Sequence, residues 1–260
     1  MACCKCGERL LIFKPDTKCP CDIREAVNFG ERREGYSTDL LLLHYTGMEN
    51  GEAAEDWLCR EDSGVSCHYL VHEDGAVVQM VAEDKRAWHA GKSSWQGIAD
   101  INSRSIGIEI VNQGHGENYQ DFPGPQISAV IALSKDIIER HHIPAQHVLG
   151  HSDVAPGRKL DPGEKFPWQQ LHENGVGLWV SPAPAVFNGF FQIGDNGEPV
   201  AALQAMLSFY GYGVEISGNY DQATHDCIYA FQQHFRQEKV DGIADGATIA
   251  TLDRLLRALP

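Results

Sequence analysis

Residues 39–44 read Asp-Leu-Leu-Leu-Leu-His, and this run sets the organisation of the chain around it. Four consecutive leucines between a polar residue and the Thr46-Gly47 pair predict a short buried strand. His44 is therefore expected at the end of a strand, where mixed sheets commonly assemble their binding sites.

Three more strands are predicted downstream of this run. Residues 68–71 and 76–80 are separated by Glu73-Asp74-Gly75, a turn-forming sequence that suits a hairpin. Residues 105–111 form a strand in which three isoleucines point to one side and Glu109 points to the other. A carboxylate in the middle of such a strand is costly to bury unless it is paired or faces a polar site.

A helix is predicted over residues 126–142, where isoleucine and valine recur at helical spacing after Pro125. A short strand at 147–149 follows, and it leads into the loop 150–163, which is rich in proline and glycine. Because strands and helices interleave, we expect an α/β fold up to residue 180, with a mixed central β-sheet flanked by helices.

The sequence changes character near residue 181, where prolines and small residues without periodicity predict a linker. Helices are predicted beyond it at 198–210, 222–236 and 246–259, with Asn196, Asp221 and Asp245 as their N-caps. The last two of these helices share an Asp-x-x-Thr start. The predicted domains are a Cys-rich N-terminal extension (1–30), an α/β domain (31–180), a linker (181–188) and a small three-helix domain (189–260).

Composition and charge exclude several classes of protein. Of the 260 residues, 43% are hydrophobic and 22% are charged, as in soluble globular chains. Lys and Arg total 21 against 36 Asp and Glu, and the net charge of −15 repels phosphate backbones, so nucleic acid is not expected as a partner. No stretch approaches the roughly 18 to 20 apolar residues of a transmembrane segment. The apolar run near the N-terminus is also shorter than the roughly 7 to 15 residues of a signal peptide's apolar region.

Most of the cysteines are gathered at the N-terminus. The first 21 residues contain Cys3, Cys4, Cys6, Cys19 and Cys21. They read C-x2-C and then C-x-C, which is close to a zinc-ribbon pattern but one residue short in the second pair. A second, structural zinc at this cluster is one hypothesis, and a flexible, partly oxidised tail is the other.

Two histidines differ from the rest because each follows an apolar strand. They are His44 and His151, and Asp161 lies beyond His151 across a loop that can fold back. Two imidazoles and a carboxylate match the ligand set of catalytic zinc with a fourth position open to water. The alternative is two packing histidines and a capping aspartate. Glu109 is then a candidate general base, and Lys159 could stabilise a developing oxyanion or be an ordinary loop lysine.

Five other histidines are set aside as structural or exposed, because their helical or near-terminal positions give no convergence of ligands. They are His141, His142, His172, His225 and His234.

Five ordered motifs carry a family resemblance. They are LLLHYT (41–46), SCHYLV (66–71), WHAG (88–91), NSRSIGIEIVN (102–112) and GHSDVAPGRKLDPG (150–163). Together they resemble the zinc-dependent N-acetylmuramoyl-L-alanine amidases of the amidase-2 class, which are related to peptidoglycan recognition proteins. The segment GNYDQATHDCIYAFQQHF (218–235) similarly resembles a peptidoglycan-binding three-helix module.

The resemblance implies an activity and roles for particular residues. The activity is hydrolysis of the amide between the lactyl group of N-acetylmuramic acid and L-alanine, in peptidoglycan or muropeptides, during cell-wall turnover. His44, His151 and Asp161 would be zinc ligands, Glu109 the general base and Lys159 the oxyanion stabiliser. Trp88, His89 and Asn102 would line the substrate groove, although Trp88 could equally belong to the core. The three-helix domain would tether the enzyme to the wall, and its deletion is expected to spare small muropeptides.

Two other functions stay open from the sequence. One is a peptidoglycan recognition protein without hydrolysis, but such modules typically lack a zinc ligand that is present here. The other is a metallopeptidase that cuts within the stem peptide. The pairing of domains favours the cell envelope, whereas the absence of a visible signal peptide favours the cytoplasm.

Overall fold

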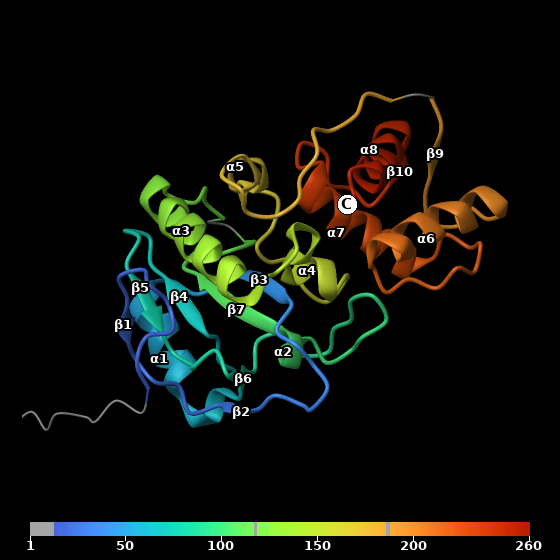
Figure 1. Cartoon of the computed structure of the whole chain (residues 1–260). Coiled ribbons are helices and arrows are strands. Elements are labelled where there is room, and N and C mark those ends of the chain that lie inside the picture. The colour runs from blue at the N-terminus through green and yellow to red at the C-terminus, as the bar shows by residue number, and fades with distance from the viewer. Residues whose placement is uncertain (1–12, 117–118, 186–187) are drawn as a thin grey trace, which may run out of the picture.

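The fold is that of a computed structural model, which describes residues 13–116, 119–185 and 188–260. Within these residues six strands form a mixed sheet in the order β1-β5-β4-β7-β3-β8 (Figure 1). Only the β4–β5 pair is antiparallel in this sheet. The strands are β1 (Asp22–Ile23), β3 (Leu40–Tyr45), β4 (Tyr69–Val71), β5 (Val77–Gln79), β7 (Ser105–Ile110) and β8 (Val148–Gly150). The expected mixed sheet and its hairpin are confirmed.

The remaining elements surround this sheet. Two small antiparallel pairs join β2 (Phe29–Glu31) to β6 (Lys85–Ala87) and β9 (Phe190–Phe191) to β10 (Ala244–Asp245). The helices of the first part of the chain are α1 (Gly51–Cys59), α2 (Ile101–Arg104), α3 (Gly124–His141), α4 (His151–Val154) and α5 (Trp168–Glu173). No helix in the described part of the chain combines the length and apolar character needed to cross a bilayer.

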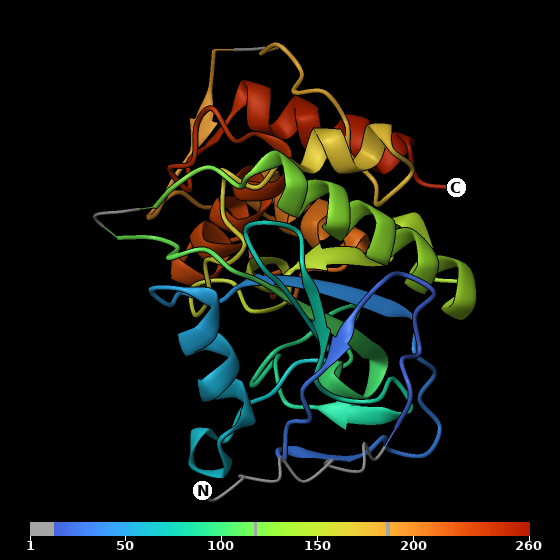
Figure 2. The same ribbon diagram turned by 90° about the vertical axis from the view of Figure 1, so that its left-hand side faces the viewer.

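One face of the sheet is covered by α3, as Figure 2 shows. The three isoleucines of β7 are fully buried and belong to the same cluster as Ile127, Val130 and Ile137 of α3. This confirms both the alternation predicted for 105–111 and the helix predicted for 126–142. Glu109 consequently lies on the opposite face of the sheet.

That opposite face is covered in two parts. Leu70 and Val78 cluster with residues of α1, whereas Leu40 and Leu42 cluster with the C-terminal helices. His44 and Glu109 lie on this same face, because they alternate along their strands with the residues that face α3.

The C-terminal helices are α6 (Glu198–Tyr210), α7 (Gln222–Phe235) and α8 (Gly246–Arg257). Asp221 and Asp245 cap α7 and α8 as predicted, since each side chain accepts a hydrogen bond from the backbone N–H of the threonine three residues later. The prediction of Asn196 as the N-cap of α6 is wrong. Gly197 occupies that position, because Asn196 is held in a β-bridge to Asn219 and the helix begins later, with Pro199 in its first turn.

Glu83 joins α3 to the sheet through a buried ionic cluster. Its carboxylate accepts hydrogen bonds from Tyr69 of β4 and from Arg140 and His141 of α3. Burial alone would raise the pKa of Glu83, but these hydrogen bonds outweigh that effect and lower the pKa to about 2. The ionised carboxylate therefore stabilises the folded chain fully above about pH 4.5, and this contribution is lost as the pH falls toward 2.

Replacing Glu83 by glutamine is expected to lower the free energy of unfolding at pH 7 by about 3 kcal/mol, because Arg140 loses one of its two buried carboxylate partners and keeps only Asp136. The deficit relative to the native chain should shrink by about 1 kcal/mol at pH 3.5. Urea unfolding at both pH values measures it. Glu31→Gln is the matched control, since the exposed Glu31–Lys85 pair is screened by solvent and should contribute little to stability. Equal deficits in the two variants would contradict the assigned role of Glu83.

Candidate metal centre

The carboxyl ends of three parallel strands meet at the face opposite α3. His44 lies near the end of β3, and Glu109 is its partner in register on β7. His151 begins α4 directly after β8, which pairs with the other edge of β3. The loop that follows α4 turns back and brings Asp161 to the same place. Parallel pairing thus brings together residues that are far apart in sequence.

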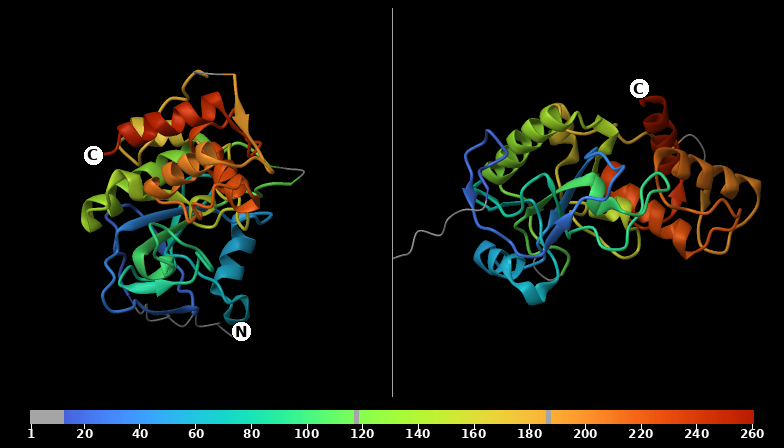
Figure 3. Two further views of the ribbon diagram at one scale, coloured as in Figure 1. Left: turned by 90° about the vertical axis from the view of Figure 1, so that its right-hand side faces the viewer. Right: turned by 60° about the horizontal axis from the view of Figure 1, so that its bottom comes forward.

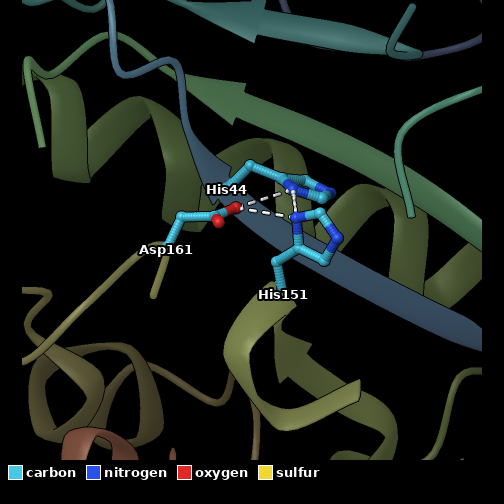
Figure 4. A group of neighbouring side chains, drawn as sticks. All are labelled: His44, His151 and Asp161. Atoms are coloured by element: carbon cyan, nitrogen blue, oxygen red, sulfur yellow. Dashed lines mark hydrogen bonds and ion pairs between the residues drawn. The ribbon is translucent and has the colours of Figure 1, made fainter. Parts of the chain in front are cut away.

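The side chains of His44, His151 and Asp161 converge on one point (Figure 4). The two Nδ1 atoms are 3.0 Å apart, and Asp161 Oδ2 lies 2.9 Å from that of His44 and 3.0 Å from that of His151. All three residues are buried. Among the residues that the structure describes, this is the one group of three or more such side chains with the spacing of a metal site.

The chemistry of these donors fits a zinc ion. Tetrahedral zinc with bonds of about 2.0–2.2 Å separates adjacent ligand atoms by about 3.3–3.6 Å, a few tenths of an ångström more than the observed spacing, so small side-chain shifts would admit the ion. Burial lowers the pKa of His44 to about 4, so its imidazole is neutral at physiological pH. Burial alone would raise the pKa of Asp161, but the interactions with His151 and His44 outweigh this effect. The net pKa lies well below its ordinary value, so this side chain is a carboxylate. Two imidazoles and one carboxylate leave a fourth position for water.

Outer contacts present the Nδ1 atoms to this point. The Nε2 of His44 lies 3.0 Å from Nδ1 of His89, and the Nε2 of His151 lies 3.0 Å from the carbonyl oxygen of Ala90. When each Nε2 carries the proton and donates it, the lone pair of Nδ1 is free to bind a metal. A Cβ atom at Gly107 would lie 2.6 Å from the ring of His89, so glycine is required for this packing.

Glu109 lies beside this group with an unsatisfied carboxylate. Its Oε2 atom is buried and has no hydrogen-bond partner, although the residue as a whole is only half-buried. Burial raises the pKa of Glu109 well above its ordinary value, the negative charge of Asp161 raises it further, and Lys159 acts in the opposite direction. An unpartnered buried carboxylate is expected to be retained for chemistry rather than for stability.

A cavity of about 430 Å³ opens over Glu109, His151 and Asp161. Of the residues expected to bind substrate, Trp88 and His89 line it, and Lys159 lines it together with Glu109. Asn102 does not belong to the lining. Its buried Oδ1 accepts hydrogen bonds from the backbone N–H groups of His89 and Ala90, so it fixes the turn that carries them.

The sequence did not point to several other residues of this cavity. Trp57 and Leu58 of α1 form one wall, and Arg158 and Leu160 lie on the loop before Asp161. The guanidinium of Arg158 donates to the carbonyl oxygens of Ala90 and Lys92. Arg158 and Lys159 are two adjacent cationic residues just before the expected ligand Asp161, and only Lys159 was assigned a role from the sequence.

The N-terminal cysteines fall largely outside this description. Cys3, Cys4 and Cys6 lie outside the described residues. Cys19 and Cys21 are half-buried free thiols and belong to no group of metal ligands among the described residues. The hypothesis of a second, structural zinc therefore finds no support here.

Comparison with known proteins adds two sequence matches. Residues 34–164 match the family described as N-acetylmuramoyl-L-alanine amidase, and residues 196–252 match a putative peptidoglycan binding domain. The chain is 35% identical over 249 residues to the N-acetylmuramoyl-L-alanine amidase AmiD of Escherichia coli, covering 86% of this chain and 89% of that protein. It is 34% identical to the 1,6-anhydro-N-acetylmuramyl-L-alanine amidase AmpD of Enterobacter cloacae, over 54% of this chain and 82% of that one.

Solved structures show the same similarity. AmiD from E. coli, in complex with anhydro-N-acetylmuramic acid-L-Ala-D-gamma-Glu-L-Lys, matches 88% of this chain and 97% of its own, with a TM-score of 0.74 at 34% identity. AmpDh3 from Pseudomonas aeruginosa, in complex with anhydromuramic pentapeptide, matches 96% of this chain and all of its own, with a TM-score of 0.72 at 29% identity.

Proposed function

The chain belongs to the N-acetylmuramoyl-L-alanine amidase family, and we propose that it hydrolyses the amide between the lactyl group of N-acetylmuramic acid and L-alanine with one zinc ion bound by His44, His151 and Asp161. The observation that carries this proposal is the convergence of these three donors, two of which line one cavity together with Glu109. Its substrates are peptidoglycan fragments or muropeptides, the class to which the ligands of the AmiD and AmpDh3 complexes belong.

Each residue of the site has a distinct role in this proposal. Zinc, when bound, polarises the lactyl carbonyl and lowers the pKa of the attacking water. Glu109 takes the proton from that water and returns it to the leaving amine of L-alanine. Its raised pKa is suited to this exchange, because a carboxylate with an ordinary pKa is a weaker base and takes up the proton less readily. Lys159 offers its ammonium group to the oxygen that becomes negative during attack.

Residues around the metal ligands bind and orient. Trp88 and Trp57 present apolar surface on the walls of the cavity, which suits contact with a sugar ring or an alanine methyl group. His89 acts behind His44 by fixing its tautomer, in addition to lining the cavity. Asn102 acts indirectly, because it holds the turn of residues 88–91.

We further propose the domain limits 31–180, 181–188 and 189–260, which the two family matches support. The expected extension 1–30 is not separate along its whole length, because β1 pairs with β5 and so belongs to the central sheet. The C-terminal domain binds peptidoglycan and raises the concentration of the enzyme at the wall. The pairing of these two domains favours the cell envelope as the location, and the cytoplasm is the alternative. Cell fractionation decides between them.

Mass spectrometry of digested sacculi tests the scissile bond. We expect released stem peptides with a free L-alanine amino terminus and glycan chains with an intact lactyl carboxylate. Cleavage within the stem peptide would indicate a metallopeptidase instead. Binding to sacculi without any released peptide, by zinc-loaded protein, would indicate a recognition protein.

A further inference from the structure

The segment from Gly150 to Phe166 carries two of the three proposed zinc ligands, His151 and Asp161, and it packs against the C-terminal helices. Figures 1 and 3 show α4 beside α7, and the two helices are in contact. We propose that Tyr212 and His234 are positioning residues of the metal site, which act through Asp153 on the segment from Gly150 to Phe166. This inference rests on the proposed function and gives the C-terminal domain a role in catalysis besides tethering.

Asp153 is the main connection between the two parts. It lies on α4 two residues after His151 and is completely buried. Its Oδ2 accepts from the backbone N–H of Gly150, at 2.8 Å, and from Nδ1 of His234, at 2.8 Å. Its Oδ1 accepts from the hydroxyl of Tyr212, at 2.6 Å. A buried carboxylate needs such partners, and two of these three come from the C-terminal domain.

The ring of His234 is fixed on both faces. It stacks on Trp168, with ring centroids 3.7 Å apart, and on Phe235, with centroids 4.0 Å apart. Trp168 begins α5, just beyond the segment that carries Asp161. His234 therefore contacts Asp153, near the start of this segment, through its nitrogen, and Trp168, just beyond its end, through its ring face.

Further contacts from α7 and from the residues just after it hold the backbone next to Asp161. Gln233 donates to the carbonyl oxygen of Leu160, the residue directly before Asp161, at 3.2 Å. Gln237 donates to the carbonyl oxygens of Glu164 and Phe166, at 2.6 and 2.7 Å. The backbone is thus fixed on both sides of the proposed carboxylate ligand.

An apolar core spans the same interface. Leu40 and Leu42 of β3 and Val154 of α4 share one buried cluster with Leu207 and Phe231 of the C-terminal helices. The strand that ends in His44 therefore also packs against this domain. Deleting the domain would expose this core, so a deletion cannot separate tethering from catalysis, and point substitutions are needed.

Tyr212→Phe is the test variant, and Tyr220→Phe is its matched control. Both remove one hydroxyl from a buried tyrosine, but the hydroxyl of Tyr220 donates to Gly242 within the C-terminal domain and contacts nothing near the metal site. His234→Phe removes the second donor and keeps an aromatic ring, whereas His234→Asn restores an N–H donor at a similar position. Zinc affinity is measured by competition with a chelator, and kcat and KM are measured on a small soluble muropeptide.

We expect Tyr212→Phe and His234→Phe to bind zinc several-fold more weakly, a smaller loss than the roughly 10–100-fold for groups that contact a metal ligand directly, because they act through Asp153. Their kcat should fall with little change in KM, His234→Asn should recover part of the affinity, and Tyr220→Phe should match the native chain. If His234→Phe fails to fold, Tyr212→Phe alone gives the answer. Native zinc affinity and kcat in Tyr212→Phe, or equal losses in Tyr212→Phe and Tyr220→Phe, would overturn the proposal.

This outcome is separable from a failure of the proposed function. Zinc affinity is measured with the metal alone, so it reports on the positioning residues even if the substrate proves to be different. Native protein that leaves the muramoyl-alanine bond intact would refute the proposed function and not this inference.

Discussion

In the Glu109→Ala variant, kcat for a soluble muropeptide should fall about 10²–10⁴-fold while the chain keeps one zinc ion. The reason is that proton transfer and metal binding belong to different residues. The carboxylate of Glu109 lies beside the three convergent donors but is not one of them. Metal content measured on the same sample as kcat separates the two functions.

Stability provides a control for this variant. Because Oε2 of Glu109 is buried without a partner, its removal should not lower the melting temperature. Glu109→Gln, which keeps the shape and cannot take up a proton, should lose a similar amount of activity. Retained turnover in either variant would remove Glu109 from the mechanism.

Asp161→Ala should lose zinc and activity together. Loss of an outer partner of a ligand commonly costs about 10–100-fold in metal affinity, and loss of a ligand itself should cost more. The two histidines remain, but their Nδ1 atoms alone form an incomplete site. Isothermal titration with zinc, followed by an activity assay in excess metal, measures both effects.

The contrast between these two variants is informative. Glu109→Ala should be inactive and loaded with metal, whereas Asp161→Ala should be inactive and empty. Normal zinc content in Asp161→Ala would mean that a ligand has been misassigned.

Much of the fold could be predicted because its signals are local. Four leucines in a row, alternating isoleucines and a long amphipathic helix each report burial directly. The short strands β1, β2 and β6 were not predicted, since only a few of their residues are buried and no clear period arises. The helix α1 was missed although its buried residues recur at helical spacing, because only Leu58 among them is a large apolar residue. The Asn196 cap was wrong because a β-bridge between distant residues determines its backbone.

The convergence of the site could also be predicted, because parallel strands bring their carboxyl ends together. What the sequence could not show is how the two domains meet. His234 was set aside because its position on a helix gives no hint of Asp153, which lies 81 residues earlier. Likewise, the dependence of His44 on His89 appears only when β3 and the turn of residues 88–91 are packed together.

The central claim is that two imidazoles and one carboxylate bind a catalytic zinc ion. Anomalous diffraction at the zinc absorption edge, from crystals of protein that cleaves a muropeptide, tests it most directly. The account predicts one strong peak per chain within about 2.0–2.2 Å of the Nδ1 atoms of His44 and His151 and of a carboxylate oxygen of Asp161. Active protein without a peak at that position would contradict it.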